Sequence, residues 1–580
     1  MKKLYKIVLA LILTFTLVGC TSDNKSEKED FTKFVEELPA LLAGTNGFDL
    51  NYTFHNPSAY GIDKEVGDIE AATTKEYEES FTECKDLLKE LEAFDYDSLT
   101  KEQQEDYDVL KDYLERQLLL EDYVYFDNNY LGSYIGMQAQ LPIILLEFEL
   151  HDKQDLETYL NVLKTAPEAF KGYADIERER QDEGVGMSQV LLDGVIEQCE
   201  NFANGDVTFL VDEMNDKIDA AEFLSDAEKE EAKINNESYT KNEFVQAYTT
   251  LKEELQSITP DKADGGIADQ ENGQEYYEAL FQNQCGFDWT IDELEDYLEE
   301  KESEYMSVVY KAMLKDPSIE TTMFGQSYGT FNSAEENIDY LADKYTEYFP
   351  DAGMMKYRVV DIPESMQENF SPAAYLTSRI DRQDDEPLLI LINGEYESSN
   401  FSTIAHEGYP GHMYQDCYFQ QLDVSSFRYL LSCKGYAEGW ATYIEGQAHW
   451  FTQEDNEDIL EVYEDYQKLN HAMMAKWDIN INYHGMTREE FKAEIESMYG
   501  EGVLTDEELY DQYNILLENP TNYLMYFVNG LYMDELYNKA EEELGKDFDQ
   551  VEFHEVILDI GSVSMTLLTE KVDAYIEENK

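Results

Sequence analysis

The chain has 580 residues, of which 126 are acidic and 42 are basic, and its formal net charge at neutral pH is −84. A surface with so much negative charge repels the phosphate backbone, so the composition excludes nucleic acid as a partner. The same charge repels other copies of the chain, and we therefore expect a monomer. Hydrophobic residues make up 43% of the chain, which is enough for a large buried core.

The start of the chain has the pattern of a bacterial export leader. A basic start precedes an apolar run from 7 to 17, which is shorter than the ~20 residues of a membrane-spanning helix and typical of a secretory signal. The run ends in Leu-Val-Gly-Cys, the pattern of a lipobox, in which the cysteine is lipidated and becomes the new N-terminus. We therefore predict a signal peptide at 1–19 and an extracytoplasmic lipoprotein that is anchored to the membrane through Cys20. Ordinary signal cleavage beside an incidental cysteine is the alternative.

Most of the chain beyond Cys20 has the apolar spacing of helices. The polar segment 20–35 is the exception, and we predict that it is a flexible tether. Apolar residues recur every three or four positions in the following segments, which we predict to be helices: 78–91, 102–122, 155–180, 188–203 and 291–315. The Gly- and Asp-rich segment 259–274 is the best internal boundary. It separates an N-terminal helical half at 36–265 from a half at 266–580 that carries the chemical motifs, and we expect the two halves to pack as one body.

One short segment has the pattern of a β-strand instead. Residues 387–393 form an apolar run that begins at a proline and ends at an Asn-Gly turn. The run lies just before the histidine motif described below. We therefore predict a mainly α fold, large and multi-helical, with a small β-sheet beside the helix of that motif.

The cysteines beyond Cys20 do not indicate a disulfide framework, because they are widely scattered and odd in number. Their spacing is not that of a cysteine zinc site either. These residues are Cys84, Cys199, Cys285, Cys417 and Cys433. A disulfide such as Cys417–Cys433 stays open.

The strongest chemical signal lies in residues 403–416, which read TIAHEGYPGHMYQD. In the familiar zinc-protease pattern, two histidines lie four residues apart on a helix, so that both face one ion. Here the spacing is six, which on a regular helix would turn His412 ~120° away from His406. Pro410 must break the helix, and Gly411 tolerates the unusual dihedral angles that follow. A bulged turn would therefore bring His412 back to the same ion.

A catalytic zinc ion needs a third protein ligand, and the next predicted helix offers one. Residues 434–450 read KGYAEGWATYIEGQAHW, in which Glu438 lies 26 residues after His412 and Glu445 lies two turns further on the same face. Glutamate-type zinc proteases take their third ligand from such a helix. We therefore predict a Zn²⁺ site made of His406, His412 and Glu438, with Glu445 orienting a histidine ligand from behind. Only eight histidines occur in the chain, and this concentration favours a metal site over a chance HE pair.

These motifs resemble those of the bacterial "domain of unknown function 885" family, which is grouped with the thermolysin-related zinc peptidases, the gluzincins. The family hallmark HE-x-x-P-G-H-x-x-Q stands here at His406–Gln415, and its EGWA-x-Y-x-E helix stands at Glu438–Glu445. Softer similarities lie at 136–142 and 553–558, and the resemblance spans roughly residues 45–575. It implies a metallopeptidase-like fold, zinc as the cofactor and peptides as the substrate.

The chain departs from the family pattern at a few positions. Met413 stands where many members have a second histidine, and Lys476 and Asn480 stand where members tend to have an arginine and an aspartate. Pro520–Tyr523 reads Pro-Thr-Asn-Tyr where the family has Pro-Gly-Gln-Ala. These changes leave the predicted ligands and Glu407 intact.

The resemblance and the motif together predict the hydrolysis of peptide bonds. A bound zinc ion would polarise the scissile carbonyl and lower the pKa of its water. Glu407, beside the first histidine, would take the proton from that water and pass it to the leaving amine. The tetrahedral oxyanion needs a further donor. The candidates are Tyr526, which matches the tyrosine of the family's Pro-Gly-Gln-Ala-x-x-Tyr, and the histidines His484 and His554.

The predicted strand at 387–393 has two interpretations. In related zinc peptidases, the edge of a small sheet beside the active helix binds the substrate backbone by strand addition, and this strand would do the same. The alternative is a simple buried strand.

Two other functions stay open. The protein could be a non-catalytic lipoprotein that binds peptides or a metal, or a zinc hydrolase of another amide or ester. The intact Glu407 argues against the first, because a protein that only binds does not need a base.

Overall fold

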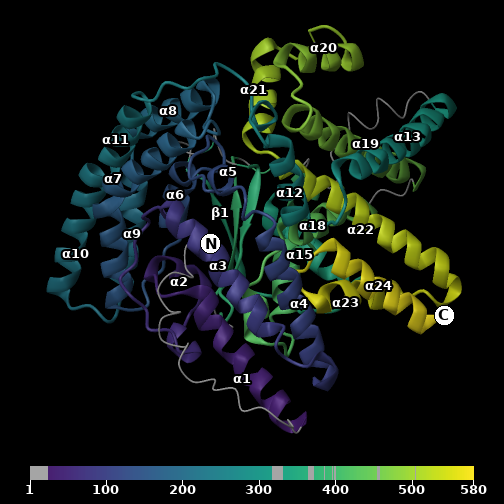
Figure 1. Ribbon diagram of the computed structural model, residues 1–580, viewed down its shortest axis with the longest axis horizontal. Coiled ribbons are helices and arrows are strands. Elements are labelled where there is room, and N and C mark those ends of the chain that lie inside the picture. Colours follow the sequence, from purple (N-terminus) through teal and green to yellow (C-terminus); the bar gives the residue numbers. More distant parts are fainter. Residues whose placement is uncertain are drawn as a thin grey trace. The chain divides into compact units, whose positions relative to one another are not determined.

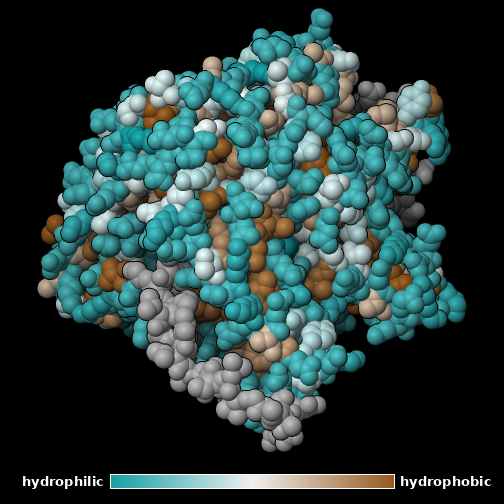
Figure 2. Space-filling model, in the orientation of Figure 1, coloured by the Kyte–Doolittle hydropathy of each residue, from teal (hydrophilic) through white to brown (hydrophobic). Residues whose placement is uncertain are grey.

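The computed structural model describes residues 24–580 apart from 317–330, 364–366, 368–370, 384–385, 395, 397–399, 453–456 and 503 (Figure 1). The predicted signal peptide and Cys20 lie outside the described residues. Within the described part of the chain, no helix is both long and apolar enough to cross a membrane. The face drawn in Figure 2 is mostly hydrophilic, which agrees with the large excess of acidic residues.

The prediction of a flexible tether at 20–35 is wrong for most of that segment. Helix α1 (Asn24–Ala43) begins within it. Phe31, Val35 and Leu38 follow one another at spacings of four and three residues, and all three are buried. They form the apolar face of an amphipathic helix, which the dense charges around them conceal in the sequence.

The described chain divides into two compact units. Unit 1 takes the chain up to Gly273 together with the short segments 379–383 and 425–430, and unit 2 takes the remainder. The change from one unit to the other at Gly273 falls inside the glycine-rich segment 259–274. The sequence gives no sign that two short segments of the second half belong to unit 1.

Unit 1 is helical. After α1 its helices are α2 (Gly47–Thr53), α3 (Thr74–Leu91), α4 (Lys101–Leu118), α5 (Val124–Asp127), α6 (Met137–Leu146), α7 (Lys153–Asp182), α8 (Gln189–Asn204), α9 (Thr208–Ala220), α10 (Asp226–Tyr239) and α11 (Val245–Leu255). Thr73, Thr100 and Asp152 begin α3, α4 and α7 with capping boxes, which satisfy the first free N–H groups of each helix. The long helix α7 carries much of the core, including the buried Tyr159 and Phe170.

Unit 2 holds the predicted site and is also mainly helical. Its helices are α12 (Gly273–Cys285), α13 (Ile291–Lys315), α15 (Ala334–Lys344), α16 (Phe401–Glu407), α17 (His412–Phe419), α18 (Lys434–Ala448), α19 (Glu457–Asn482), α20 (Arg488–Tyr499), α21 (Asp506–Glu518), α22 (Asn522–Leu544), α23 (Gln550–Ile560) and α24 (Met565–Asn579). The five helices predicted from apolar spacing match α3, α4, α7, α8 and α13. The cysteines of the described chain are buried thiols, so the Cys417–Cys433 disulfide is not formed.

The small sheet of unit 2 confirms the predicted strand. It consists of β1 (Tyr357–Asp361), β2 (Ala373–Leu376) and β3 (Leu388–Ile392), in the order β1-β3-β2. Strand β3 is entirely buried and pairs with β1 in parallel and with β2 in antiparallel. Because β3 has a partner on each side, its backbone has no free edge for a peptide, and its interpretation as the substrate-binding strand is wrong.

The free edge of the antiparallel pair belongs to β2. The N–H of Asn393 donates to the carbonyl oxygen of Pro372 (2.9 Å), and ladder bonds in an antiparallel pair fall on alternate residues. In the observed register, Ala373 and Tyr375 therefore turn their backbone groups away from β3. The backbone groups that point outward along this edge of the sheet are therefore those of Ala373 and Tyr375.

Helices α18 and α22 approach each other unusually closely, because glycines face the contact. A Cβ atom on Gly439 of α18 would lie 2.5 Å from the Cβ of Asn529 on α22. A Cβ atom on Gly435 would lie 2.5 Å from the Asn529 amide nitrogen, and one on Gly530 would lie 2.7 Å from Thr442. The backbones can come this close only because these positions carry no side chain.

We predict that Gly439→Ala destabilises unit 2. The added methyl group must push α18 away from α22, and such overpacking costs about 1–3 kcal/mol. Gly446→Ala on the same helix is the matched control, because its new Cβ would meet only the Glu464 side chain at 3.9 Å. This control should gain up to about 1 kcal/mol of helix propensity. Urea unfolding of both variants measures the difference, and equal stabilities would contradict the close-packing explanation.

Candidate metal centre

The helix that carries the first histidine ends where the sequence predicts a break. Helix α16 stops at Glu407 and α17 starts at His412. The N–H of Gly411 donates to the carbonyl oxygen of Ala405 (3.0 Å), so the intervening loop folds back over the last turn of α16. A Cβ atom at Gly411 would lie 1.8 Å from the carbonyl oxygen of His406, and only glycine fits this position.

Two aromatic side chains fix this loop, one from the loop itself and one from α18. The Tyr409 hydroxyl donates to the carbonyl oxygen of Gly353 and accepts from the N–H of Met355, both at 3.0 Å. The indole N–H of Trp440 donates to the carbonyl oxygen of Pro410 (3.0 Å). Because Trp440 lies on α18, the helix that carries Glu438 is tied directly to the loop that positions His412.

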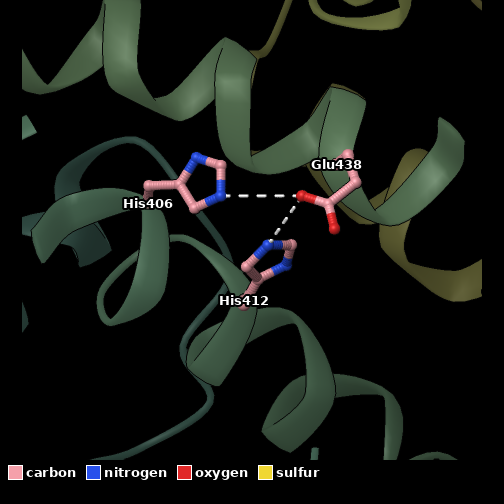
Figure 3. A group of neighbouring side chains, drawn as sticks. All are labelled: His406, His412 and Glu438. Atoms are coloured by element: carbon pink, nitrogen blue, oxygen red, sulfur yellow. Dashed lines mark hydrogen bonds and ion pairs between the residues drawn. The ribbon is translucent and has the colours of Figure 1, made fainter. Parts of the chain in front are cut away.

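The three predicted ligands point toward one another (Figure 3). Glu438 Oε2 lies 3.2 Å from His412 Nε2 and 3.7 Å from His406 Nε2. All three atoms lie within 4.8 Å of one another. Ligands at about 2.0–2.2 Å from a tetrahedral zinc ion are about 3.4 Å apart, so the cluster has nearly the size that zinc requires. Two imidazoles and one carboxylate are also the donors that zinc prefers, and the residues therefore fit this ion.

The cluster is buried and electrostatically suited to a cation. Burial alone would lower the pKa of His406, but hydrogen bonds to Glu438 and Glu445 raise this pKa well above its usual value. Burial works against the charge of Glu438, yet the positive charge of His412 and the hydrogen bonds from both histidines hold the pKa of Glu438 well below its usual range. The carboxylates thus stabilise positive charge at this point.

The predicted base, Glu407, lies beside the ligand cluster. Its Oε1 is 4.0 Å from His406 Nε2, and its Oε2 accepts a hydrogen bond from the backbone N–H of Tyr375 (2.6 Å). The edge strand β2 therefore orients the carboxylate. Tyr375 is itself fixed, because its hydroxyl donates to Asp416 on α17 (2.5 Å). No motif in the sequence indicates Tyr375, since its role depends on a backbone group.

Two further predicted residues lie in contact with His406. Glu445 Oε1 is 2.9 Å from His406 Nδ1, on the side of the ring opposite the ligand nitrogen. The other carboxylate oxygen of Glu445 accepts from the side-chain amide of Gln467 on α19 (3.1 Å), a residue that the sequence did not indicate. The Tyr526 ring lies parallel to the His406 ring, with 6.1 Å between the centroids. The structure thus brings Glu445 and Tyr526 to the candidate site.

The two remaining histidines have partners outside the ligand cluster. The catalytic role predicted for His554 is wrong, because its ring is buried with both nitrogens engaged, and the role predicted for His484 stays a prediction. His484 is exposed, and its Nε2 lies 2.8 Å from Glu295 on α13. His554 on α23 is fully buried. Its Nδ1 lies 2.8 Å from the carbonyl oxygen of Tyr348, and its Nε2 lies 2.9 Å from the Tyr443 hydroxyl. A buried ring with both nitrogens engaged cannot contact a substrate.

His554 makes the stability of unit 2 depend on pH. Burial lowers the pKa of His554 from 6.5 to about 3. Between these two values the unfolded chain binds a proton that the folded chain does not bind, so stability falls as the pH falls, by about 1.4 kcal/mol per pH unit. We expect His554→Gln to remove this contribution from the slope of unfolding free energy against pH. Urea unfolding between pH 4 and pH 6.5, in the presence of a chelator, measures the slope.

The control for this prediction is His484→Gln, which removes an exposed histidine from the same unit. If burial of His554 causes the pH dependence, His554→Gln and His484→Gln should change the slope of unfolding free energy against pH by different amounts. Equal changes would show that burial of His554 is not the cause.

Comparisons with known proteins reveal relatives of this fold. No curated protein matches the chain. The crystal structure of a lipoprotein candidate from Colwellia psychrerythraea is similar, with a TM-score of 0.79 and 16% identity over 96% of this chain and 100% of that one. A lipoprotein candidate of unknown function from Shewanella oneidensis has a TM-score of 0.59 and 16% identity, over 95% of this chain and 99% of that one. These likenesses concern the fold alone.

The family profile described as "Bacterial protein of unknown function (DUF885)" matches residues 56–572, which is most of the chain. The protein therefore belongs to this bacterial family, DUF885.

Proposed function

We propose that the protein is a zinc-dependent peptidase, related in its site to the gluzincins. The observation that carries the proposal is the convergence of His406, His412 and Glu438 on one point, with Glu407 directly beside it. Three protein ligands leave a fourth position for water or substrate, as in catalytic zinc sites. A purely structural zinc site would use four protein ligands and would not need a neighbouring base.

The residues around the cluster have separate tasks in this proposal. A bound zinc ion supplies Lewis acidity and a water of lowered pKa. Glu407 takes the proton from the attacking water and gives it to the leaving amine. The Tyr375 N–H holds Oε2 of Glu407, so the free Oε1 is the oxygen that faces His406 and receives the proton. The Tyr526 hydroxyl donates a hydrogen bond to the developing oxyanion.

The substrate peptide binds along β2 in this proposal. Its outer edge presents the N–H of Ala373 and the carbonyl oxygen of Tyr375, and an extended peptide adds to such an edge by main-chain hydrogen bonds. The other two groups are engaged, because the Ala373 carbonyl oxygen accepts from Ser371 Oγ (2.8 Å) and the Tyr375 N–H donates to Glu407. Because the Tyr375 N–H donates to Glu407, this edge leads directly to the base. The geometry favours a backbone-directed mode of binding and therefore a peptide over a small ester.

The site of action is proposed to be outside the cytoplasm. The sequence predicts a lipobox at Cys20, and the similar proteins from Colwellia psychrerythraea and Shewanella oneidensis are both lipoprotein candidates. The acidic surface repels anionic lipid headgroups, so the acyl chains on Cys20 would provide the anchor. Extracellular peptides would then be the substrates of a monomeric enzyme.

Substitution of Glu407 by glutamine tests the proposed base. Glutamine has the same shape but cannot accept the proton, and loss of general base catalysis reduces turnover by about 10²–10⁴-fold. We expect Glu407→Gln to retain zinc, as measured by elemental analysis, and to lose cleavage of a mixed peptide library followed by mass spectrometry. Glu555→Gln, which removes an exposed carboxylate on α23, is the control and should cleave like the parent.

Different outcomes of this experiment separate the possible functions. Cleavage by Glu407→Gln at the parental rate would show that the proposed mechanism is wrong. A zinc-loaded parent that cleaves no peptide but retains peptides would be a binding protein. Cleavage of other amides or esters, without peptides, would assign a different hydrolase activity.

A further inference from the structure

The amide of Gln467 lies behind the metal centre, between two other polar side chains. Gln467 is on α19, and its Nε2 donates to Glu445 Oε2 (3.1 Å). Its Oε1 lies 3.0 Å from Nε2 of His449, which is in the short 3₁₀ turn η11 (His449–Phe451) after α18. The other oxygen of Glu445 contacts His406 Nδ1 at 2.9 Å. Four side chains thus form an unbroken chain that ends on a metal ligand.

We propose that Gln467 and His449 are positioning residues that orient His406 for the metal through Glu445. This inference rests on the proposed zinc site, but neither residue belongs to the motifs that define that site. Ligating histidines are usually held by a partner on the nitrogen that does not bind the metal, and such partners tune metal affinity. Here the support of His406 extends beyond Glu445 to two further side chains, those of Gln467 and His449.

The direction of each hydrogen bond in this chain follows from the chemistry of its members. A carboxylate can only accept, so the Gln467 amide must turn its NH₂ group to Glu445 and its oxygen to His449. The oxygen then requires a donor, which places the proton of His449 on Nε2. At the other end, Glu445 Oε1 lies 2.9 Å from Nδ1 of His406, an ion-pair contact that favours a proton on this nitrogen. Because the carboxylate of Glu445 faces Nδ1, Nε2 is the nitrogen of His406 that would bind the ion.

The helices on both sides keep this chain of side chains in place. Lys468, next to Gln467, lies 2.8 Å from Glu464 on its own helix and 2.8 Å from Asp534 on α22. The ion pair with Asp534 fixes α19 against α22. The His449 ring is almost fully buried and contacts the Tyr463 ring edge to face, with 4.3 Å between the centroids. Gln467 therefore has a defined position from which it can orient Glu445.

Replacement of Gln467 by methionine tests the proposal. Methionine has a similar length and volume but no donor, so one oxygen of Glu445 loses its partner. Loss of an outer partner weakens metal binding by 10–100-fold, and we expect a rise of about tenfold in the zinc dissociation constant, measured by competition with a chelating dye. Gln282→Met on α12 is the control. Gln282 donates to the carbonyl oxygen of Trp289 (3.0 Å), a purely structural amide contact in the same unit.

A double-mutant cycle distinguishes positioning from general stability. If Gln467 acts through Glu445, then Gln467→Met should change zinc affinity by less than about twofold in a Glu445→Gln background. The unfolding free energy of the zinc-free proteins is measured in parallel. His449→Phe is a second variant, which keeps the ring contact with Tyr463 and removes the donor at the far end. It should weaken zinc binding less than Gln467→Met does.

The outcomes also separate this inference from the proposed function. A parent protein that binds no zinc would contradict the proposed function itself. A parent that binds zinc, with Gln467→Met binding it equally tightly, would overturn the role of Gln467 alone. An equal loss of affinity in the presence and absence of the Glu445 carboxylate would likewise show that Gln467 does not act through Glu445.

Discussion

The close approach of Gly411 to the carbonyl oxygen of His406 is the contact on which the candidate metal centre depends. The two histidines are six positions apart, and a continuous helix would turn them away from each other. The loop instead folds over the end of α16, where no side chain fits at Gly411. His412 consequently starts a new helix with its ring directed at the same point as that of His406. The hydrogen bond from Trp440 to Pro410 then brings α18 to the loop.

Helix α18 presents carboxylates to the metal centre on one face and glycines to α22 on another face. Glu438 and Glu445 lie two turns apart and reach the two nitrogens of the His406 ring. Gly435 and Gly439 allow the backbone of α22 to come close, and α22 carries Tyr526. The ligand Glu438, the carboxylate of Glu445 that supports His406, and the proposed oxyanion donor Tyr526 are therefore positioned by a single helix–helix contact. The polar chain through Gln467 adds α19 to the same arrangement.

The sequence predicts the parts of this site that depend on local chemistry. Pro410 implies the break in the helix, and the spacing of apolar residues implies α3, α4, α7, α8 and α13. The sequence does not predict Tyr375 or Gln467, because the first acts through its backbone and the second through a partner 22 residues away on another helix. The presence of a histidine does not by itself identify a catalytic residue, because His554 packs in the core. Similarly, the charges of α1 conceal the apolar face made by Phe31, Val35 and Leu38.

X-ray absorption spectroscopy of the zinc-loaded protein tests most directly whether His406, His412 and Glu438 hold one ion. The structure leads us to expect one zinc ion per chain, with two imidazole nitrogens and only oxygen ligands beside them, at about 2.0–2.2 Å. The imidazole scattering should decrease by half in His412→Ala. Sulfur at about 2.3 Å, the absence of imidazole scattering, or an unchanged spectrum in His412→Ala would contradict the assignment of the metal centre.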